Sequence, residues 1–204
     1  NYMNEEYEVS LINNNGKNTH SVTNKTHFNS ATTGNHSHSV TIASLSNATT
    51  AGDYSDAITL GYNSHATTAG VCSHAITKGN YSNAISAGDY STALTFGKEA
   101  NAMVAGNGAD AKTMGKCSNA IASGCLSRAS VAGQNSIACS LGVEAKARGK
   151  LGSWLVVAEW GKNNPKDPLE EFIPLGIVVA QVDGEKIKPN RWYKAKGGKL
   201  IKCD

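Results

Sequence analysis

The sequence predicts an all-β protein, a parallel β-solenoid followed by a small antiparallel β module. Three observations favour this fold class. From residue 10 to residue 152 the chain repeats the nine-residue unit S-x-A-x-x-x-G-x-x. Several places of the unit alternate between successive units, so the structural repeat has eighteen residues. Beyond residue 152 the repeat stops, and all three tryptophans and all four prolines lie in this last part.

Glycine marks the period most clearly, because it recurs every nine residues from Gly52 to Gly142. A fixed short period is typical of stacked solenoids, in which each repeat contacts only its neighbours. One coil of eighteen residues then contains two short strands and two turns, a two-strand β-roll of about eight coils. Parallel coils rise about 4.8 Å each, which predicts a rod roughly 38 Å long.

The start of the chain departs from the pattern. Residues 1–9 precede the repeat and carry three glutamates, so we expect a segment that is disordered or contacts another element. In the first units Lys25 stands at the glycine place and Phe28 at the serine place. Terminal repeats cap a solenoid and are commonly irregular. The predicted organisation is an N-terminal segment 1–9, a solenoid 10–152 and a capping module 153–204.

The last part of the chain predicts further strands. Residues 153–160 and 172–182 are β-branched and apolar runs, each typical of a strand. Asp183-Gly184 favours a hairpin turn between strands, and two more short strands are predicted on either side of Gly197-Gly198. We expect a small antiparallel sheet that covers the last coil, because an open solenoid end exposes unpaired strand edges.

The repeat also predicts which side chains point inward. Places 1, 3, 5 and 7 of the unit carry only short side chains from Ser46 to Gly142, whereas the other places admit Asp56, Lys78 and Lys112. Since side chains alternate along a strand, the short set is expected inside a thin interior. The opposite assignment, with Ile and Leu inward, stays open. It would bury lysines, which costs free energy unless each is paired.

With the short set inside, apolar side chains at places 4 and 6 of alternate units share one outer face. A contiguous apolar patch of more than a few hundred Å² marks an interface on most soluble proteins. Copies packed side by side would bury this patch, and we expect a homotrimer as the closed arrangement of a fibre. The predicted oligomer interface consists of Val40, Ile58, Leu60, Ile76, Leu94, Phe96 and Met114.

Place 2 of the unit forms two columns, each made of side chains one coil apart. One column is asparagine, broken by His65, and the other contains histidine, aspartate and threonine. In such a stack Asn and Thr can hydrogen-bond along the axis. These columns are also candidates for binding a host-surface ligand. The predicted ligand-binding residues are Asn29, Asn47, Asn83, Asn101, Asn119, His38, Asp56 and His74.

No catalytic residue, cofactor or metal is predicted. His20 and His38 lie one coil apart, but such a column needs no metal. Asp53 and Asp89 follow repeat glycines, as in calcium-binding nonapeptides, yet the further glycines and the regular aspartate of those repeats are missing. The sequence contains no phosphate loop or paired-carboxylate cleft, and a thin solenoid offers no pocket for one. We therefore expect that the protein is not an enzyme.

Charge and composition exclude further classes. The net charge of +3 and the absence of an Arg/Lys stripe argue against nucleic-acid binding. No run of eighteen apolar residues predicts membrane insertion, and no signal peptide is evident in this chain. The five cysteines are an odd number without a common column. We expect Cys117 and Cys125 to be small buried thiols without a disulfide.

The whole chain resembles a set of phage and gut-bacterial proteins in which arrays of G-x-x-S-x-A-x-x-x-G lead into a tail. Here the tail reads Leu151-Gly-Ser-Trp-Leu-Val-Val-Ala-Glu-Trp160, then Val182-Asp-Gly-Glu-Lys-Ile-Lys-Pro189 and Trp192-Tyr193. More distantly, the array is similar to the parallel β-roll head of trimeric autotransporter adhesins, whose S-x-A-x-G units bind host surfaces. It departs from that head in its even nine-residue spacing and in lacking a membrane anchor and stalk heptads.

The resemblance implies a virion-associated or surface-fibre role and brings no catalytic residues. We expect a structural and adhesive protein on a virion or extracellular surface, such as a phage tail fibre acting in host recognition. Its expected partners are two further copies, other virion proteins and a host-surface glycan or protein. Two alternatives stay open: a non-adhesive scaffold or assembly component, and an ice-binding solenoid that uses the threonine column at place 5 of alternate units.

Overall fold

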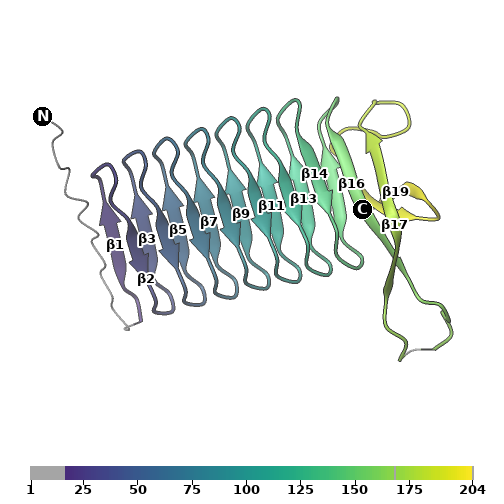
Figure 1. Ribbon diagram of the computed structural model, residues 1–204, viewed down its shortest axis with the longest axis horizontal. Helices are drawn as coiled ribbons and strands as arrows, with labels where there is room; N and C mark the ends of the chain where they lie inside the picture. Colours follow the sequence, from purple (N-terminus) through teal and green to yellow (C-terminus); the bar gives the residue numbers. More distant parts are fainter. Residues whose placement is uncertain (1–16, 168, 204) are drawn as a thin grey trace, which may run out of the picture.

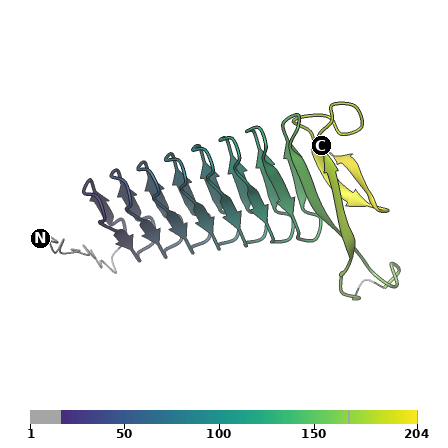
Figure 2. The same cartoon turned by 45° about the horizontal axis from the view of Figure 1, so that its top comes forward.

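The computed structural model describes residues 17–167 and 169–203, so the predicted segment 1–9 lies outside the described residues. It confirms the predicted fold class. The described residues form strands β1 to β19 and no helix. A parallel β-solenoid of about eight coils runs along the molecule and ends in antiparallel strands (Figures 1 and 2).

The first strand of each coil belongs to one sheet, which we call sheet A. Neighbouring strands pair in parallel and in register eighteen residues apart, so Ala57 lies beside Ala75 and Thr59 beside Thr77. The coil strands of sheet A are β1 (His20–Thr23), β3 (His38–Thr41), β5 (Asp56–Thr59), β7 (His74–Thr77), β9 (Thr92–Thr95), β11 (Asp110–Thr113), β13 (Arg128–Val131) and β15 (Lys146–Gly149).

The second strand of each coil belongs to sheet B, which lies against sheet A. Its coil strands are β2 (Ser30–Thr32), β4 (Ala48–Thr50), β6 (Ala66–Thr68), β8 (Ala84–Ser86), β10 (Ala102–Val104), β12 (Ala120–Ala122), β14 (Ile137–Ser140) and β16 (Trp154–Gly161). The parallel stacking continues past residue 152, because β16 pairs in parallel with β14.

The interior between the two sheets contains the short side chains of the repeat. The alanines at place 3 and the serines at place 1 are fully buried along most of the array, as Ala75 and Ser73 illustrate with 0% exposure. Place 5 is buried as well, including Thr59 and Thr77. The predicted inward set is therefore confirmed, and the opposite assignment, with Ile and Leu inside, is wrong. Larger interior side chains, such as Leu155 and Val157, occur at the C-terminal end.

Glycine at place 7 is favoured by the close approach of the preceding coil and not by a positive φ. A Cβ atom at Gly79 would overlap the carbonyl oxygen of Gly61 in the preceding coil, and the same holds for Gly97 against Gly79. The nine-residue period of glycine thus records the places where successive coils touch through their backbones.

Place 9, two residues after each glycine, adopts the left-handed backbone conformation that favours glycine. Yet it is occupied by Tyr54 (φ 54°), Cys72 (φ 52°) and Leu126 (φ 56°), among others, and by a glycine at Gly108. Tyrosine, cysteine and leucine do not indicate a positive φ, but Asn63, Asn135 and Gly108 at the same place do, so this column carries a partial signal for the conformation.

Four predicted strands of the last part are confirmed, but their pairing differs from the expectation. Strand β17 (Ile173–Gln181) pairs antiparallel with β16 in sheet B. Strands β18 (Trp192–Lys196) and β19 (Lys199–Cys203) form a hairpin that extends sheet A. The single covering sheet is therefore wrong: each sheet of the solenoid receives its own antiparallel extension.

The end of the interior is closed by the segment that crosses between the two extensions. Val182, Ile187 and Tyr193 are buried and join the alanine core. The predicted hairpin turn at Asp183-Gly184 is wrong, because the chain passes there from sheet B to sheet A. The Asp183 carboxylate instead accepts the N–H groups of Ile187 and Glu185, which lower its pKa.

Candidate functional site

The asparagine column lies on the outer face of sheet B and works as a hydrogen-bond ladder. Asn101 Oδ1 accepts the N–H of Asn119 at 3.1 Å, and Asn101 Nδ2 donates to Asn83 Oδ1 at 3.1 Å. His65, which breaks the column, keeps the ladder, because its Nδ1 accepts the N–H of Asn83 at 3.1 Å. The predicted axial bonding of asparagine is confirmed. Ligand binding by this column stays a prediction, and its carbonyl oxygens are already engaged.

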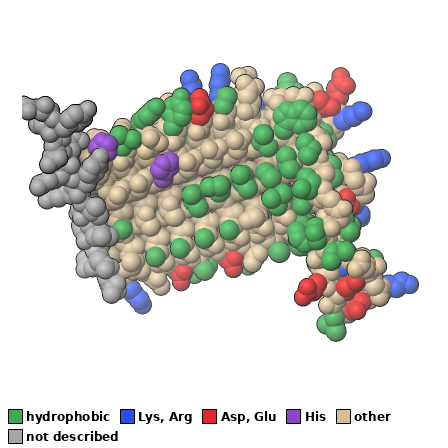
Figure 3. Space-filling view, viewed as in Figure 1, with side chains coloured by type: hydrophobic (Ala, Val, Ile, Leu, Met, Phe, Trp, Pro, Cys, Tyr) green, Lys and Arg blue, Asp and Glu red, His purple; other side chains and the backbone are tan. Residues whose placement is uncertain are grey.

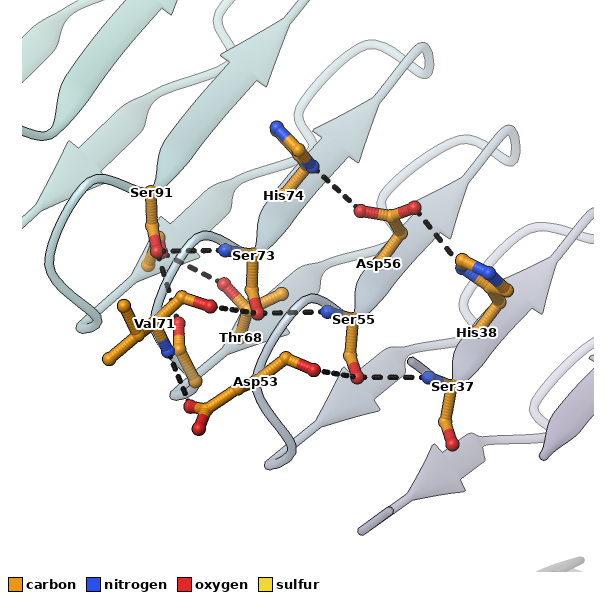
Figure 4. Close-up of polar contacts among 12 residues, drawn as sticks. Ser37, His38, Asp53, Ser55, Asp56, Thr68, Val71, Ser73, His74 and Ser91 are labelled. Atoms are coloured by element: carbon orange, nitrogen blue, oxygen red, sulfur yellow. Dashed lines mark hydrogen bonds and ion pairs between the residues drawn. The ribbon is translucent and has the colours of Figure 1, made fainter. Parts of the chain in front are cut away.

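The histidine and aspartate column lies on the outer face of sheet A (Figure 4). The Asp56 carboxylate lies between two imidazoles, 3.1 Å from His38 Nδ1 and 2.8 Å from His74 Nδ1. His20 stacks on His38 with ring centroids 5.0 Å apart. His38 and His74 keep 39% and 50% of their side chains exposed. The structure thus brings these predicted residues into one continuous chain of contacts.

The repeat serines have a structural role that the sequence analysis missed. Ser55 Oγ accepts the N–H of Ser37 at 3.0 Å (Figure 4) and donates to the carbonyl of Gly34 at 3.2 Å. Ser73 repeats both bonds one coil further on. Serine at a fixed place next to the turn glycine was the available signal. These hydroxyls satisfy turn groups that the parallel ladder leaves unpaired.

The aspartates after the repeat glycines are part of the turns. Asp53 Oδ1 accepts the N–H of Val71 in the next coil at 2.8 Å (Figure 4), and Asp89 does the same for Asn107. The predicted axial bonding of threonine is confirmed at Thr68 of sheet B, which donates to Ser86 Oγ at 2.9 Å. Thr59 of sheet A instead donates across the turn to the carbonyl of Ser64 at 3.2 Å.

A charged cluster follows the histidine column toward the C-terminal module. Arg128 donates to both carboxylate oxygens of Asp110, at 2.6 and 2.7 Å. Lys112 Nζ lies 3.0 Å from Asp110 Oδ2. Asp110 is only 7% exposed. Burial raises the pKa of Asp110, but the hydrogen bonds from Arg128 and Lys112 outweigh it and leave the pKa below its ordinary value.

Two guanidinium groups fix the C-terminal module to the array. Arg148 lies 4.4 Å from the ring centroid of Trp192, and Arg128 lies 5.9 Å from it. Arg148 Nε also donates to Ser130 Oγ at 2.9 Å. Cation–π contacts of this kind stabilise by about 0.5–1 kcal/mol at exposed sites. The sequence pattern could not pair a tail tryptophan with these two coils.

Beside this cluster, the outer face of sheet A is hollowed into a groove of about 460 Å³. Its shape follows from side-chain size, because the small Ser130 and Ala132 lie one coil beyond Lys112 and Met114. The groove has an apolar part and a cationic part. Its lining includes Leu94, Phe96, Met114, Lys112, Arg148 and Asn190.

The predicted interface residues all lie on the outer face of sheet A, at outward places of its strands and the turns that follow them. Leu60, Phe96 and Met114 are 40%, 43% and 53% exposed. The other four, Val40, Ile58, Ile76 and Leu94, are partly covered by their neighbours in the column. The geometry of the patch is as expected, and its use as an interface stays a prediction.

Sheet B carries a second apolar patch that the sequence analysis missed. In Figure 3 hydrophobic side chains form a row on the visible face and gather at the C-terminal end, while charged side chains lie along its edges. This is the pattern of sheet B, whose outward places carry no Asp, Glu, Lys or Arg from β2 to β16. The apolar members nearest the C-terminal end are Ile121, Ile137, Cys139, Leu141, Trp154, Val156, Ile177 and Val179.

The predicted burial of Cys117 and Cys125 is wrong, because both thiols lie exposed in turns. Within residues 17–167 and 169–203 no group of three or more His, Cys, Asp or Glu side chains is arranged to hold a metal ion. Nor does this part of the chain contain a helix that could span a membrane.

Comparison with known proteins gives no family for the chain. No protein-family model matches it, and no curated protein or solved structure is significantly similar to it.

Proposed function

We propose that the chain is a structural module of a virion or surface fibre, a stiff rod that assembles with copies of itself. The observation that carries this proposal is that polar side chains on the surface bond to one another, whereas large apolar side chains stay exposed. Polar side chains of the columns bond from coil to coil, as Asn101 and Asn47 do, and hold the rod together. Large apolar side chains such as Leu60 and Phe96 are left in water. Such a surface favours packing against protein.

The mass of the full chain in solution tests the assembly. We expect native mass spectrometry and light scattering to give a multiple of 21.3 kDa. Three copies would agree with the closed fibre arrangement expected from the sequence. A strictly monomeric and soluble chain at micromolar concentration would contradict the proposal.

A second candidate function, adhesion, is favoured by the groove on sheet A. Its volume of about 460 Å³ falls in the range of small-molecule sites, roughly 300–1,000 Å³. Lys112 and Arg148 beside Phe96 suit an acidic sugar with one apolar face. Glycan-array binding by the assembled protein would support adhesion if Arg148→Gln reduces the signal at least tenfold. No binding to any glycan would favour the pure scaffold.

The threonine column does not favour ice binding. An ice-binding surface requires threonines exposed to solvent, whereas Thr41, Thr59, Thr77 and Thr95 are each 0% exposed.

A further inference from the structure

We propose that copies of the chain meet through the C-terminal end of sheet B, where edge strand β17 of one copy pairs antiparallel with β17 of another. This proposal rests on the assembly proposed above and names the face that carries it. It differs from the interface expected on sheet A.

The first observation is that β17 is an unprotected edge. It is the last strand of sheet B, nine residues long, and contains no charged residue. The last strand of sheet A, β19, ends at the same side of the molecule but carries Lys199 and Lys202 exposed. Lysines of this kind prevent edge strands from pairing with other chains. One edge is therefore guarded and the other is left open.

The second observation is the direction of the free backbone groups. The Val182 N–H donates to the carbonyl of Ser153 at 2.8 Å, so even-numbered residues of this segment bond toward β16. By alternation, the N–H and C=O groups of Ile177, Val179 and Gln181 point to the open edge. The only proline of the strand, Pro174, lies next to the bulge at its other end.

These groups are self-complementary about a twofold axis. An antiparallel pair of β17 strands centred at Val178 sets Ile177 of one copy opposite Val179 of the other. Every hydrogen-bonded pair in this arrangement joins two odd-numbered residues, so each such pair exchanges its free N–H and C=O groups. Interfaces with twofold symmetry use the same patch on both copies.

The third observation is the apolar surface beside this edge. Ile177, Val179 and Trp154 are 63%, 55% and 45% exposed and lie on one face, because Val179 pairs with Val156 and Trp154 with Gln181. Ile137, which pairs with Trp154 and is 41% exposed, extends this face. A contiguous exposed apolar surface of this kind is a common mark of a protein–protein contact.

Charge favours a second copy over other partners. The face carries no Asp, Glu, Lys or Arg that would attract an oppositely charged partner, and none that would repel an identical one. Pairing the two copies would join two nine-stranded sheets into one and set the two apolar patches side by side on one continuous face. An assembly of this kind contains two copies or a multiple of two.

The test compares two lysine substitutions on opposite faces of the full chain, Ile177→Lys in β17 and Leu60→Lys on sheet A. Both side chains are exposed, so circular dichroism and melting temperature should stay close to those of the wild type. We expect an even-numbered assembly whose mass halves with Ile177→Lys at 10 μM, while Leu60→Lys leaves the mass unchanged.

The outcomes separate this inference from the proposed function. A wild-type chain that is monomeric contradicts both. A wild-type assembly that survives Ile177→Lys and dissociates with Leu60→Lys leaves the structural role standing and overturns the β17 interface. An assembly of three copies also overturns it, because a twofold axis cannot generate three.

Discussion

The solenoid array and the C-terminal module are built from the same two sheets but obey different rules. In the array every side chain has a counterpart one coil away, so Asn101 meets Asn119 and Ala75 meets Ala57. In the module the partners are unique, as for Trp192 between two arginines. The comparison shows that the sequence repeats because each coil contacts an equivalent coil. In the module no equivalent coil follows, so the size and polarity of the side chains are no longer restricted to the repeat pattern.

Replacing a glycine by alanine is expected to change the free energy of unfolding far more in the array than in the module. Gly79→Ala places a Cβ atom against the backbone of Gly61, and neither backbone can move without shifting its coil. We expect it to lower the free energy of unfolding by about 3–5 kcal/mol. The matched control is Gly176→Ala in β17, where no atom lies within 4 Å of the new Cβ. Urea denaturation should show the control within about 0.5 kcal/mol of the wild type. Equal losses for both variants would refute this account of the period.

The junction of the two regions should respond to acid. Because the folded pKa of Asp110 is lowered, its contribution to stability is complete above the unfolded value of 3.8 and is lost as the pH falls through the folded pKa. We expect Asp110→Asn to cost about 1–2 kcal/mol at pH 7 and to flatten the stability profile below pH 4.

Asp53→Asn serves as the control for Asp110→Asn, because the amide oxygen still accepts the N–H of Val71. Thermal melts from pH 2 to pH 7 measure both variants. An unchanged acid profile in Asp110→Asn would assign the acid sensitivity to other carboxylates.

The smallest expected effect concerns the turns of the array. Leu126 has a φ of 56°, which costs a side chain with a Cβ atom about 1 kcal/mol more than glycine. We expect Leu126→Gly to raise the free energy of unfolding by about 0.5–1 kcal/mol. The converse change, Gly108→Ala at φ 63°, should lower it, and its Cβ would also crowd the ring of Tyr90. A loss with Leu126→Gly would mean that the leucine makes a contact worth more than the strain.

The fold of the array followed from the sequence because one physical constraint recurs in every unit. Place 7 is glycine from Gly52 to Gly142 and place 3 is alanine from Ala48 to Ala138, so the period, the inward set and the sheet A patch were all predictable. The pairing of β17 with β16 was not, because apolar runs such as 172–182 specify a strand but not its neighbour. The apolar patch on sheet B was missed partly for the same reason, because β17 supplies two of its members, Ile177 and Val179.

The sequence predicted which side chains of the candidate site stack in columns, but not all of the hydrogen bonds that they make. Stacking placed Asp56 between His38 and His74, as the eighteen-residue repeat requires. The role of serine depends on turn geometry that the sequence does not display, whereas the asparagine ladder followed from the stacked column. Place 9 is a mixed case, because Tyr54 and Leu126 do not indicate a left-handed turn, while Asn63 and Gly108 at the same place do.

The uniform register between coils makes the length of the molecule adjustable. Strand β5 pairs with β7 in the same way as β3 pairs with β5, so removal of residues 56–73 would bring β3 beside β7 with no change in alignment. Each such step of eighteen residues alters the distance between the two ends by about 4.8 Å. A step of nine would instead exchange the outer surfaces of the two sheets from that point on. The length of the array can therefore change by whole coils, while the structures at its two ends stay the same.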